Sequence, residues 1–269
     1  MRTLVHISDL HFGRTDDQVV ATLLETIKDI KPDLLVVSGD LTQRAKEEQF
    51  VAAREFLDSL PYERIVVPGN HDVPLYNIFS RFFRPLTKYR RLISENLEPT
   101  YIDSEIAVIG LSTARSLVVK NGRINEKQIA RVREKLKDVS PDVVRVIVTH
   151  HPFDLDMEAS EGELVGRAAC AMQAFAAMKV DLLLAGHVHT SGSSTTASRY
   201  QLGDYSAVFV QAGTATSTRL RHEANTFNVI QISSAQITVQ KMEWRADQRS
   251  FQRSEATGFV RTEDRWIAG

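Results

Sequence analysis

The chain has little of what marks secreted or membrane-spanning proteins. Its single cysteine, Cys170, excludes an internal disulfide framework and is typical of a reducing cytoplasm. No apolar run approaches the roughly 20 residues that cross a bilayer, and no charged leader precedes a long apolar core at the start of the sequence. We therefore expect a soluble cytoplasmic protein without a membrane span.

An excess of charge of one sign is also missing. The 33 Lys and Arg residues are balanced by 34 Asp and Glu residues, so the formal net charge is −1. This balance provides no global attraction to nucleic acid or to an anionic membrane, and a nucleic-acid partner is not expected. With 43% hydrophobic residues in 269, the chain can form one globular domain with a full-sized core.

Five short apolar runs are present, and each is followed by a polar block. Runs such as 34–37 are typical of parallel strands buried on both faces, and Gly39 after that run lets the backbone turn tightly. Open α/β sheets place their ligands at the carboxyl ends of such strands. Each block alone is more typical of a turn or loop, but five of them after five buried runs are hard to explain as turns. The blocks are Asp9-Leu10-His11, Gly39-Asp40, Asn70-His71-Asp72, His150-His151 and His187-Val188-His189.

The side chains in these blocks predict a centre for two metal ions. Nitrogen and oxygen ligands without a thiolate suit Mn, Fe, Zn or Co better than Ca or Mg. Two divalent ions, two aspartates and a bridging hydroxide sum to about +1, which suits an anionic phosphoester. His71 is not needed as a ligand and is left to protonate the leaving oxygen. The candidate ligands are Asp9, His11, Asp40, Asn70, His150, His187 and His189, with Asp40 as the bridge.

The rest of the chain predicts helices between the strands and a change of pattern near its end. Residues 16–30 have helical periodicity with Asp16 as the N-cap, and 168–178 form an alanine-rich helix in which Cys170 is a packing residue. Strand patterns at 207–211, 226–232 and 237–242 follow one another without helices, which suggests a second, antiparallel sheet beside the first. We expect 191–198 to be a loop and the acids of 154–163 to be solvated.

Two further segments have open interpretations. In 73–100, aromatic residues alternate with arginines and prolines exclude one long helix. The segment can form a cap over the site, with arginines that reach a phosphate, or a cationic helix on a membrane surface. We favour a third interpretation, in which the aromatic residues pack in the core and the basic residues form a solvated face. Residues 246–269 are interpreted as a polar C-terminal extension that wraps the body or meets a second subunit, which leaves a homodimer open.

The five blocks, in this order, resemble the motifs of the calcineurin-like metallophosphoesterases over roughly residues 1–190. The resemblance implies an α/β fold, a four-layer α-β-β-α sandwich of two mixed sheets flanked by helices, with the domain over 1–245. It implies two ions, Mn, Fe or Zn or a mixed Fe/Mn or Fe/Zn pair, and makes Asp40 and His71 catalytic and Asn70 and His71 substrate-binding. By resemblance, one metal takes Asp9, His11, Asp40 and His189, and the other takes Asp40, Asn70, His150 and His187.

Departures from the family pattern limit which branch of the family the chain resembles. The protein Ser/Thr phosphatases usually have Asp-Arg-Gly where Gln43-Arg44-Ala45 stand, and a glutamate at Asp72, so the partner that orients His71 is unassigned. The branch that hydrolyses a nucleotide-linked lipid usually has arginine at His71. The chain most resembles bacterial class III cyclic-nucleotide phosphodiesterases, which implies hydrolysis of phosphodiesters such as cAMP. A glycerophosphodiesterase, a broad-specificity phosphatase, a nuclease and a catalytically silent metal-binding scaffold are the alternatives.

Overall fold

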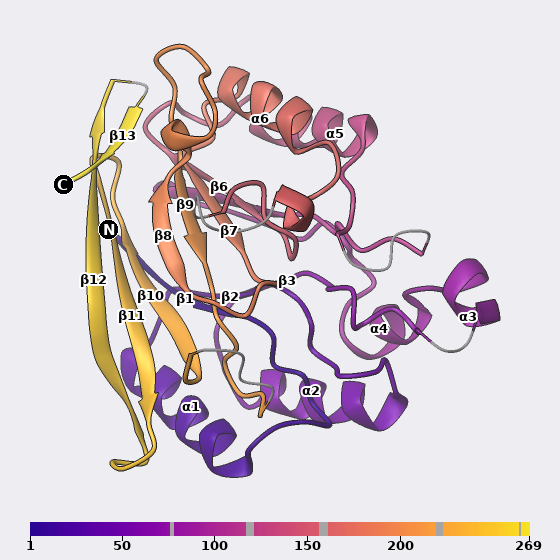
Figure 1. Ribbon diagram of the computed structural model, residues 1–269. Coiled ribbons are helices and arrows are strands. Elements are labelled where there is room, and N and C mark those ends of the chain that lie inside the picture. Colours follow the sequence, from indigo (N-terminus) through magenta and orange to yellow (C-terminus); the bar gives the residue numbers. More distant parts are fainter. Residues whose placement is uncertain (76–77, 117–120, 156–160, 219–222, 264) are drawn as a thin grey trace.

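Two β-sheets packed face to face organise the chain in the computed structural model (Figure 1). The structure describes residues 1–75, 78–116, 121–155, 161–218, 223–263 and 265–269. Within these ranges, the strand order of the larger sheet is β13-β12-β11-β10-β1-β2-β3 and that of the smaller sheet is β4-β5-β6-β7-β9-β8. Both sheets contain parallel and antiparallel pairs and helices flank them, so the predicted sandwich of two mixed sheets is confirmed.

The larger sheet joins the two ends of the chain. Its first three strands are parallel, and β10 then pairs antiparallel with the free edge of β1, from Arg2 opposite Ile232 to His6 opposite Asn228. Each later strand adds to the one before it as a hairpin. The strands are β1 (Arg2–Ile7), β2 (Leu34–Val37), β3 (Arg64–Val66), β10 (Thr226–Ile232), β11 (Gln236–Arg245), β12 (Ser250–Thr262) and β13 (Arg265–Ala268).

The smaller sheet comes from the middle of the chain. Its four central strands are parallel, and an antiparallel strand lies at each edge. The prediction that 207–242 form a separate antiparallel sheet is wrong, because β9 continues the smaller sheet beside β7 while β10 and β11 extend the larger one. The strands are β4 (Thr100–Ile102), β5 (Ile106–Gly110), β6 (Val144–Val148), β7 (Leu182–Ala185), β8 (Gly192–Thr195) and β9 (Val208–Gln211).

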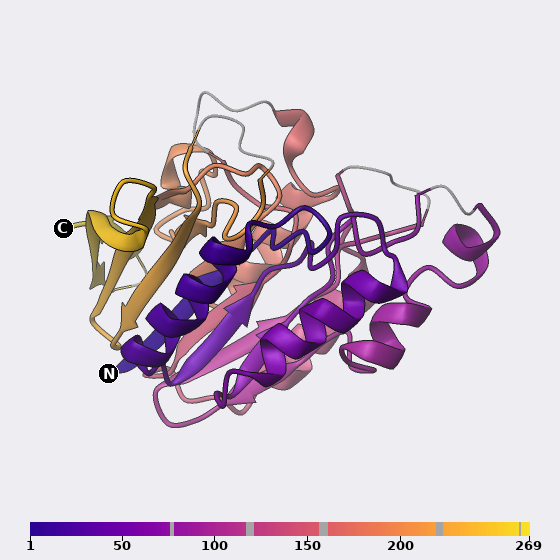
Figure 2. The same cartoon turned by 90° about the horizontal axis from the view of Figure 1, so that it is seen from below.

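Helices cover the outer faces of both sheets (Figures 1 and 2). The predicted N-cap of the first helix is confirmed, because the Asp16 carboxylate accepts from the backbone N–H groups of Gln18 (2.9 Å) and Val19 (3.3 Å). Helices α1 and α2 pack on the larger sheet, and α5 and α6 pack on the smaller one. The helices are α1 (Asp17–Ile30), α2 (Glu47–Asp58), α3 (Ile78–Phe83), α4 (Thr87–Leu92), α5 (Glu126–Leu136) and α6 (Ala168–Ala177), with short 3₁₀ helices η1 (Glu161–Glu163) and η2 (Thr196–Ser198).

The apolar runs are continuous because each central strand is buried on both faces. In β2, Leu34 and Val36 face the other sheet, whereas Leu35 and Val37 pack in the cluster that includes α1 and α2. All four side chains are fully buried. Polar side chains are unfavourable within such a strand, so each polar block begins where its strand leaves the core. The blocks lie together there.

The C-terminal segment is part of the larger sheet. Its anchors Phe251, Phe259 and Trp266 are buried on β12 and β13, and the indole N–H of Trp266 donates to Asp181 Oδ1 at 2.9 Å. The boundary expected at residue 245 therefore falls at the end of β11, inside a hairpin, and 246–269 are not an appended extension. Cys170 is exposed and is not a packing residue.

Two loop predictions were also wrong. Residues 192–195, expected in a loop of small residues, form strand β8, which pairs with β9. Asp154, expected to be solvated, is buried and forms an ion pair with Arg199 at 2.7 Å. The predicted excursion at 117–120 and the acids between 156 and 160 lie outside the described residues.

The segment 73–100 forms two short helices, α3 and α4, and only part of our interpretation holds. Tyr89 is buried and its hydroxyl donates to the carbonyl of Val66, as expected for a core aromatic. In α3 the arrangement is reversed: Arg81 is buried, whereas Phe79 and Phe83 are exposed. The aromatic residues of α3 therefore do not contribute to the core.

Candidate metal centre

The predicted site residues meet where loops from the two sheets run side by side. The N–H of Asp9 donates to the carbonyl of Gly39 (3.1 Å), and the N–H of His11 donates to that of Asp40 (2.9 Å). The smaller sheet contributes in the same way, since the N–H of Gly186 donates to the carbonyl of His150 (3.0 Å). These bonds join the first block to the second and the fourth to the fifth, so the polar blocks of neighbouring strands lie side by side.

One group of candidate ligands converges around Asp9. Asp9, His11, Asp40 and His189 are all buried, with potential ligand atoms within 4.8 Å of one another. Asp9 Oδ1 lies 3.1 Å from His189 Nε2 and 3.6 Å from His11 Nε2, and these two nitrogens are 3.2 Å apart. The other oxygen of Asp9 accepts from Ser8 Oγ (2.7 Å) and from the N–H of His187 (3.0 Å). Asp9 is thus held with Oδ1 directed at the two imidazoles.

A second group surrounds His150. Its Nε2 lies 3.1 Å from Asn70 Oδ1, and ligand atoms of His150, His151 and His187 lie within 4.8 Å of one another. His150 Nδ1 donates to the carbonyl of Ser38 (2.8 Å), so Nε2 is the nitrogen that offers a lone pair when the ring is neutral. His151 was not among the predicted ligands; its Nδ1 is 2.7 Å from Thr113 Oγ1 and its ring packs against that of His187.

Asp40 lies between the two groups. Its Oδ2 is 3.8 Å from His11 Nε2, and its Oδ1 is 3.4 Å from His150 Nε2. Oδ1 also accepts from the N–H of His71 at 2.8 Å, which fixes the carboxylate. One oxygen therefore faces each group, which is the arrangement that a bridging carboxylate requires.

The backbone of the site is strained. Five of the seven candidate ligands lie in the left-handed region, which non-glycine residues rarely adopt. Such residues cost about 1–3 kcal/mol each and persist where the surroundings determine them. The strain indicates that the fold holds these side chains for a purpose other than stability. The residues are Asp9 (φ 52°), His11 (φ 50°), Asp40 (φ 52°), His187 (φ 82°) and His189 (φ 64°).

Glycines allow the loops to approach closely. A Cβ on Gly186 would lie 1.8 Å from Ser8 Oγ, and a Cβ on Gly69 would lie 2.1 Å from Asp40 Oδ1. Gly186 thus lies against Ser8, which orients Asp9, and Gly69 lies against Asp40 itself. Any larger side chain there would displace Asp9 or Asp40.

The backbone carbonyl of Gln43 orients His71. Its oxygen lies 2.9 Å from His71 Nδ1, and because a carbonyl only accepts, Nδ1 carries the proton and Nε2 is left for other chemistry. Asp72 does not contact this ring and instead organises the loops, because its carboxylate accepts from the N–H groups of Leu41, Thr42 and Gly69. Burial, with the charge of Asp40 second, raises the pKa of Asp72 to about 6.

The pKa values of the buried site residues are shifted by burial and by their neighbours' charges. Burial acts to raise the pKa of Asp40, but His150 and His71 outweigh it and hold that pKa well below its usual range. Burial likewise opposes the charge on His150, but Asp40 raises the pKa of His150 to about 9. Burial, assisted by the charge of His150, lowers the pKa of His187 to about 3. Asp40 is therefore ionised and His187 is neutral, the states in which both bind metal.

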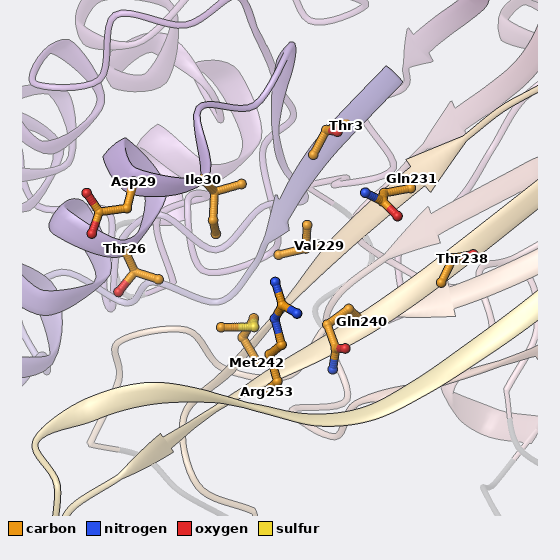
Figure 3. A pocket seen from close by; sticks show the side chains of 10 residues that line it. All are labelled: Thr3, Thr26, Asp29, Ile30, Val229, Gln231, Thr238, Gln240, Met242 and Arg253. Carbon is orange, nitrogen blue, oxygen red and sulfur yellow. The ribbon is translucent and has the colours of Figure 1, made fainter. Parts of the chain in front are cut away.

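A pocket elsewhere on the molecule is unrelated to these residues. It has a volume of about 550 Å³ and lies between α1 and the outer face of the larger sheet (Figure 3). Thr3, at the start of β1, lines it, whereas Asp9 follows the end of that strand. None of the candidate ligands belongs to its lining. The grouping of ligand atoms, and not the size of a cavity, identifies the site.

A sandwich of two mixed sheets with two neighbouring groups of buried candidate metal ligands is the arrangement of a metallophosphoesterase. The family model for calcineurin-like phosphoesterases matches residues 2–191, and the chain belongs to this family. Among the helices of the described residues, none is long and apolar enough to cross a bilayer.

Similarities to individual proteins agree with this family. The chain is 26% identical over 164 residues to the glycerophosphodiester phosphodiesterase GpdQ of Enterobacter lignolyticus, covering 56% of this chain and 58% of that protein. It is 25% identical over 160 residues to a probable cyclic nucleotide phosphodiesterase of Synechococcus sp., with the same coverage of 56% and 58%. A dimetal phosphatase from Danio rerio has the same fold, with a TM-score of 0.68, 14% identity and 97% and 99% of the two chains covered. The chain thus spans little more than half the length of the two relatives matched by sequence.

Proposed function

We propose that the protein is a phosphodiesterase that acts through two metal ions bridged by Asp40. The observation that carries this proposal is the Asp40 carboxylate, with one oxygen directed at each of two buried groups. When bound, the ions supply a hydroxide nucleophile at neutral pH and polarise the phosphoryl oxygens. One ion would be held by Asp9, His11, Asp40 and His189, and the other by Asp40, Asn70, His150 and His187.

The donor atoms support metal binding. Asp9 Oδ1 and His187 Nε2 are buried and have no hydrogen-bond partner among the described residues. Such atoms cost free energy unless a ligand satisfies them, and a cation satisfies both. The nitrogen and oxygen donors without thiolate support Mn, Fe or Zn.

His71 is proposed as the general acid. Its ring is fixed by the donation from Nδ1 to Gln43, and its ring centroid lies 4.9 Å from that of His11, beside the first group. As an imidazolium it would give the Nε2 proton to the leaving oxygen when the P–O bond breaks. Asn70, whose Oδ1 faces His150, has its amide nitrogen left to donate to a phosphoryl oxygen.

The proposed substrates are phosphodiesters, with 3′,5′-cyclic nucleotides such as cAMP and glycerophosphodiesters as the two candidates. A site charge of about +1 matches a singly charged diester better than a doubly charged monoester. One of the two relatives is named a glycerophosphodiester phosphodiesterase and the other a probable cyclic nucleotide phosphodiesterase, so each supports one candidate. Both are about 25% identical to this chain over about half of its length.

A comparison of kcat/KM tests this proposal. With Mn²⁺ or Zn²⁺ added, bis(p-nitrophenyl) phosphate should be hydrolysed with a higher kcat/KM than p-nitrophenyl phosphate, and cAMP and glycerophosphodiesters should then be compared by product analysis. The Asp40→Asn variant controls for contaminating hydrolases. A higher kcat/KM for the monoester would indicate a general phosphatase and not a phosphodiesterase. Absence of turnover of any phosphoester would favour a catalytically silent scaffold.

A further inference from the structure

Helix α3 presents a cluster of large apolar side chains to solvent. We call Phe79, Phe82 and Phe83 of α3, together with Leu75 shortly before the helix, the aromatic face. Their exposed fractions are 65%, 47%, 72% and 39%, and the rings of Phe79 and Phe83 pack with centroids 4.9 Å apart. The other exposed large apolar residues of the described ranges are scattered over the chain, at Met1, Val51, Ile102 and Ile267. Single exposed apolar residues are normal, whereas a contiguous group indicates a binding surface.

The aromatic face is held outward by a buried arginine. Arg81, on the same helix, donates from Nε to the carbonyl of Ser116 (2.9 Å) and from Nη1 to that of Pro74 (3.3 Å). An ordinary surface helix buries its apolar side and exposes its charges. In α3 the charge is inside and the phenyl rings are outside. The polar contacts of Arg81 thus anchor the helix and leave its apolar side free for another partner.

The segment that carries this face is basic in sequence. Residues 73–94 contain five basic residues and no Asp or Glu, although the whole chain has a net charge of −1. Arg91 is paired with Glu47 at 2.7 Å. Lys88 donates to the carbonyl of Ala45 and Arg90 to that of Glu95. Neither of them, nor exposed Arg84, forms an ion pair within the described ranges.

We propose that α3 and α4 dock peripherally on an anionic lipid surface. Phenyl rings insert at the boundary between headgroups and acyl chains, while nearby Lys and Arg residues attract anionic headgroups. A second copy of the chain fits less well, because a two-fold interface sets the same patch against itself and would oppose the unpaired cations. Figures 1 and 2 show α3 at the rim of the molecule, beyond the sheets, where a flat surface can reach it.

Helix α3 follows the Asn70-His71-Asp72 block along the chain. Pro74, which Arg81 holds, lies three residues after His71. Lipid docking would set where the protein works, whichever phosphoester it hydrolyses.

Vesicle co-sedimentation tests the proposal. The full-length protein should bind vesicles of phosphatidylcholine with phosphatidylglycerol, bind phosphatidylcholine alone much more weakly, and be released by high salt. The Phe79→Ala/Phe83→Ala variant should lower the partition coefficient at least about tenfold. Arg84→Glu, which changes two charges, should lower it about tenfold or more.

A matched control separates docking from general adhesion. Ile102→Ala/Ile267→Ala removes two apolar side chains with exposed fractions of 46% and 44% and should leave vesicle binding unchanged. All variants should retain the circular dichroism spectrum and the turnover of a soluble diester. Absence of wild-type binding to anionic vesicles, or an equal loss in the control, would overturn the proposal. So would conversion of a dimer to a monomer by the phenylalanine variant in light scattering. Loss of vesicle binding with intact turnover would leave the phosphodiesterase proposal standing.

Discussion

Replacement of His71 separates proton transfer from metal binding. His71→Ala removes the imidazole while all seven candidate ligands stay in place. His71 is only partly buried, and its Nδ1 forms one hydrogen bond, with Gln43, worth about 1 kcal/mol, so the variant should fold. A positioned general acid contributes about 10²–10⁴-fold. We therefore expect kcat for an alkyl phosphodiester to fall by about that factor while metal content is unchanged.

The leaving group provides the internal control for this prediction. A p-nitrophenolate leaving group needs little protonation, so His71→Ala should lose much less activity on bis(p-nitrophenyl) phosphate than on an alkyl diester. His71→Gln retains a donor that can reach the Gln43 carbonyl but cannot supply a titratable proton, so it should be as impaired as His71→Ala.

Four outcomes would refute this role. Equal losses on both leaving groups would remove the general-acid function. Recovery of activity in His71→Gln would make His71 a positioning residue. Loss of metal in His71→Ala would make it a ligand. Full activity on the alkyl diester would place the proton donor elsewhere, with His151 as the next candidate.

Two further predictions concern the framework and the pH dependence of the site. Gly186→Ala should lower the free energy of unfolding by about 1–3 kcal/mol and weaken metal binding, because the added Cβ would overlap Ser8 Oγ next to Asp9. Thermal unfolding and metal titration check this. An unchanged melting temperature would contradict it. Metal affinity should rise with pH up to about 9, by as much as about tenfold per unit, because the metal-free protein holds a proton on His150 whose pKa is raised to about 9 and metal binding must release it. Metal titration calorimetry in buffers of different ionisation enthalpy checks this sign, and affinity that is constant between neutral pH and pH 9 would contradict it.

The parallel strands and the candidate ligands could be predicted because burial on both faces leaves a plain signal. A run such as 34–37 must be apolar throughout, and a polar residue directly after it can only lie at the strand end. The chemistry of Asp and His then restricts what these side chains do. The cap at Asp16 was predictable for a similar reason, because its signal is local.

The features that could not be predicted depend on partners distant in sequence. Residues 192–195 have no apolar pattern, and only the edge of β9 makes them a strand. The open edge of β1 decided which sheet β10 would join. His71 is oriented by a backbone carbonyl, which leaves no trace in residue identity. His151, adjacent to a predicted ligand, could have been included on its position alone.

Metal stoichiometry decides whether Asp40 bridges two ions. Elemental analysis of the purified protein, reconstituted with Mn²⁺ or Zn²⁺ and freed of excess ion, should give two ions per chain. Asp40→Asn keeps the shape of the side chain but removes the charge shared by both groups, so it should retain fewer than two ions and lose activity with them. Two tightly bound ions in Asp40→Asn, or full activity in metal-free wild-type protein, would contradict the dinuclear centre.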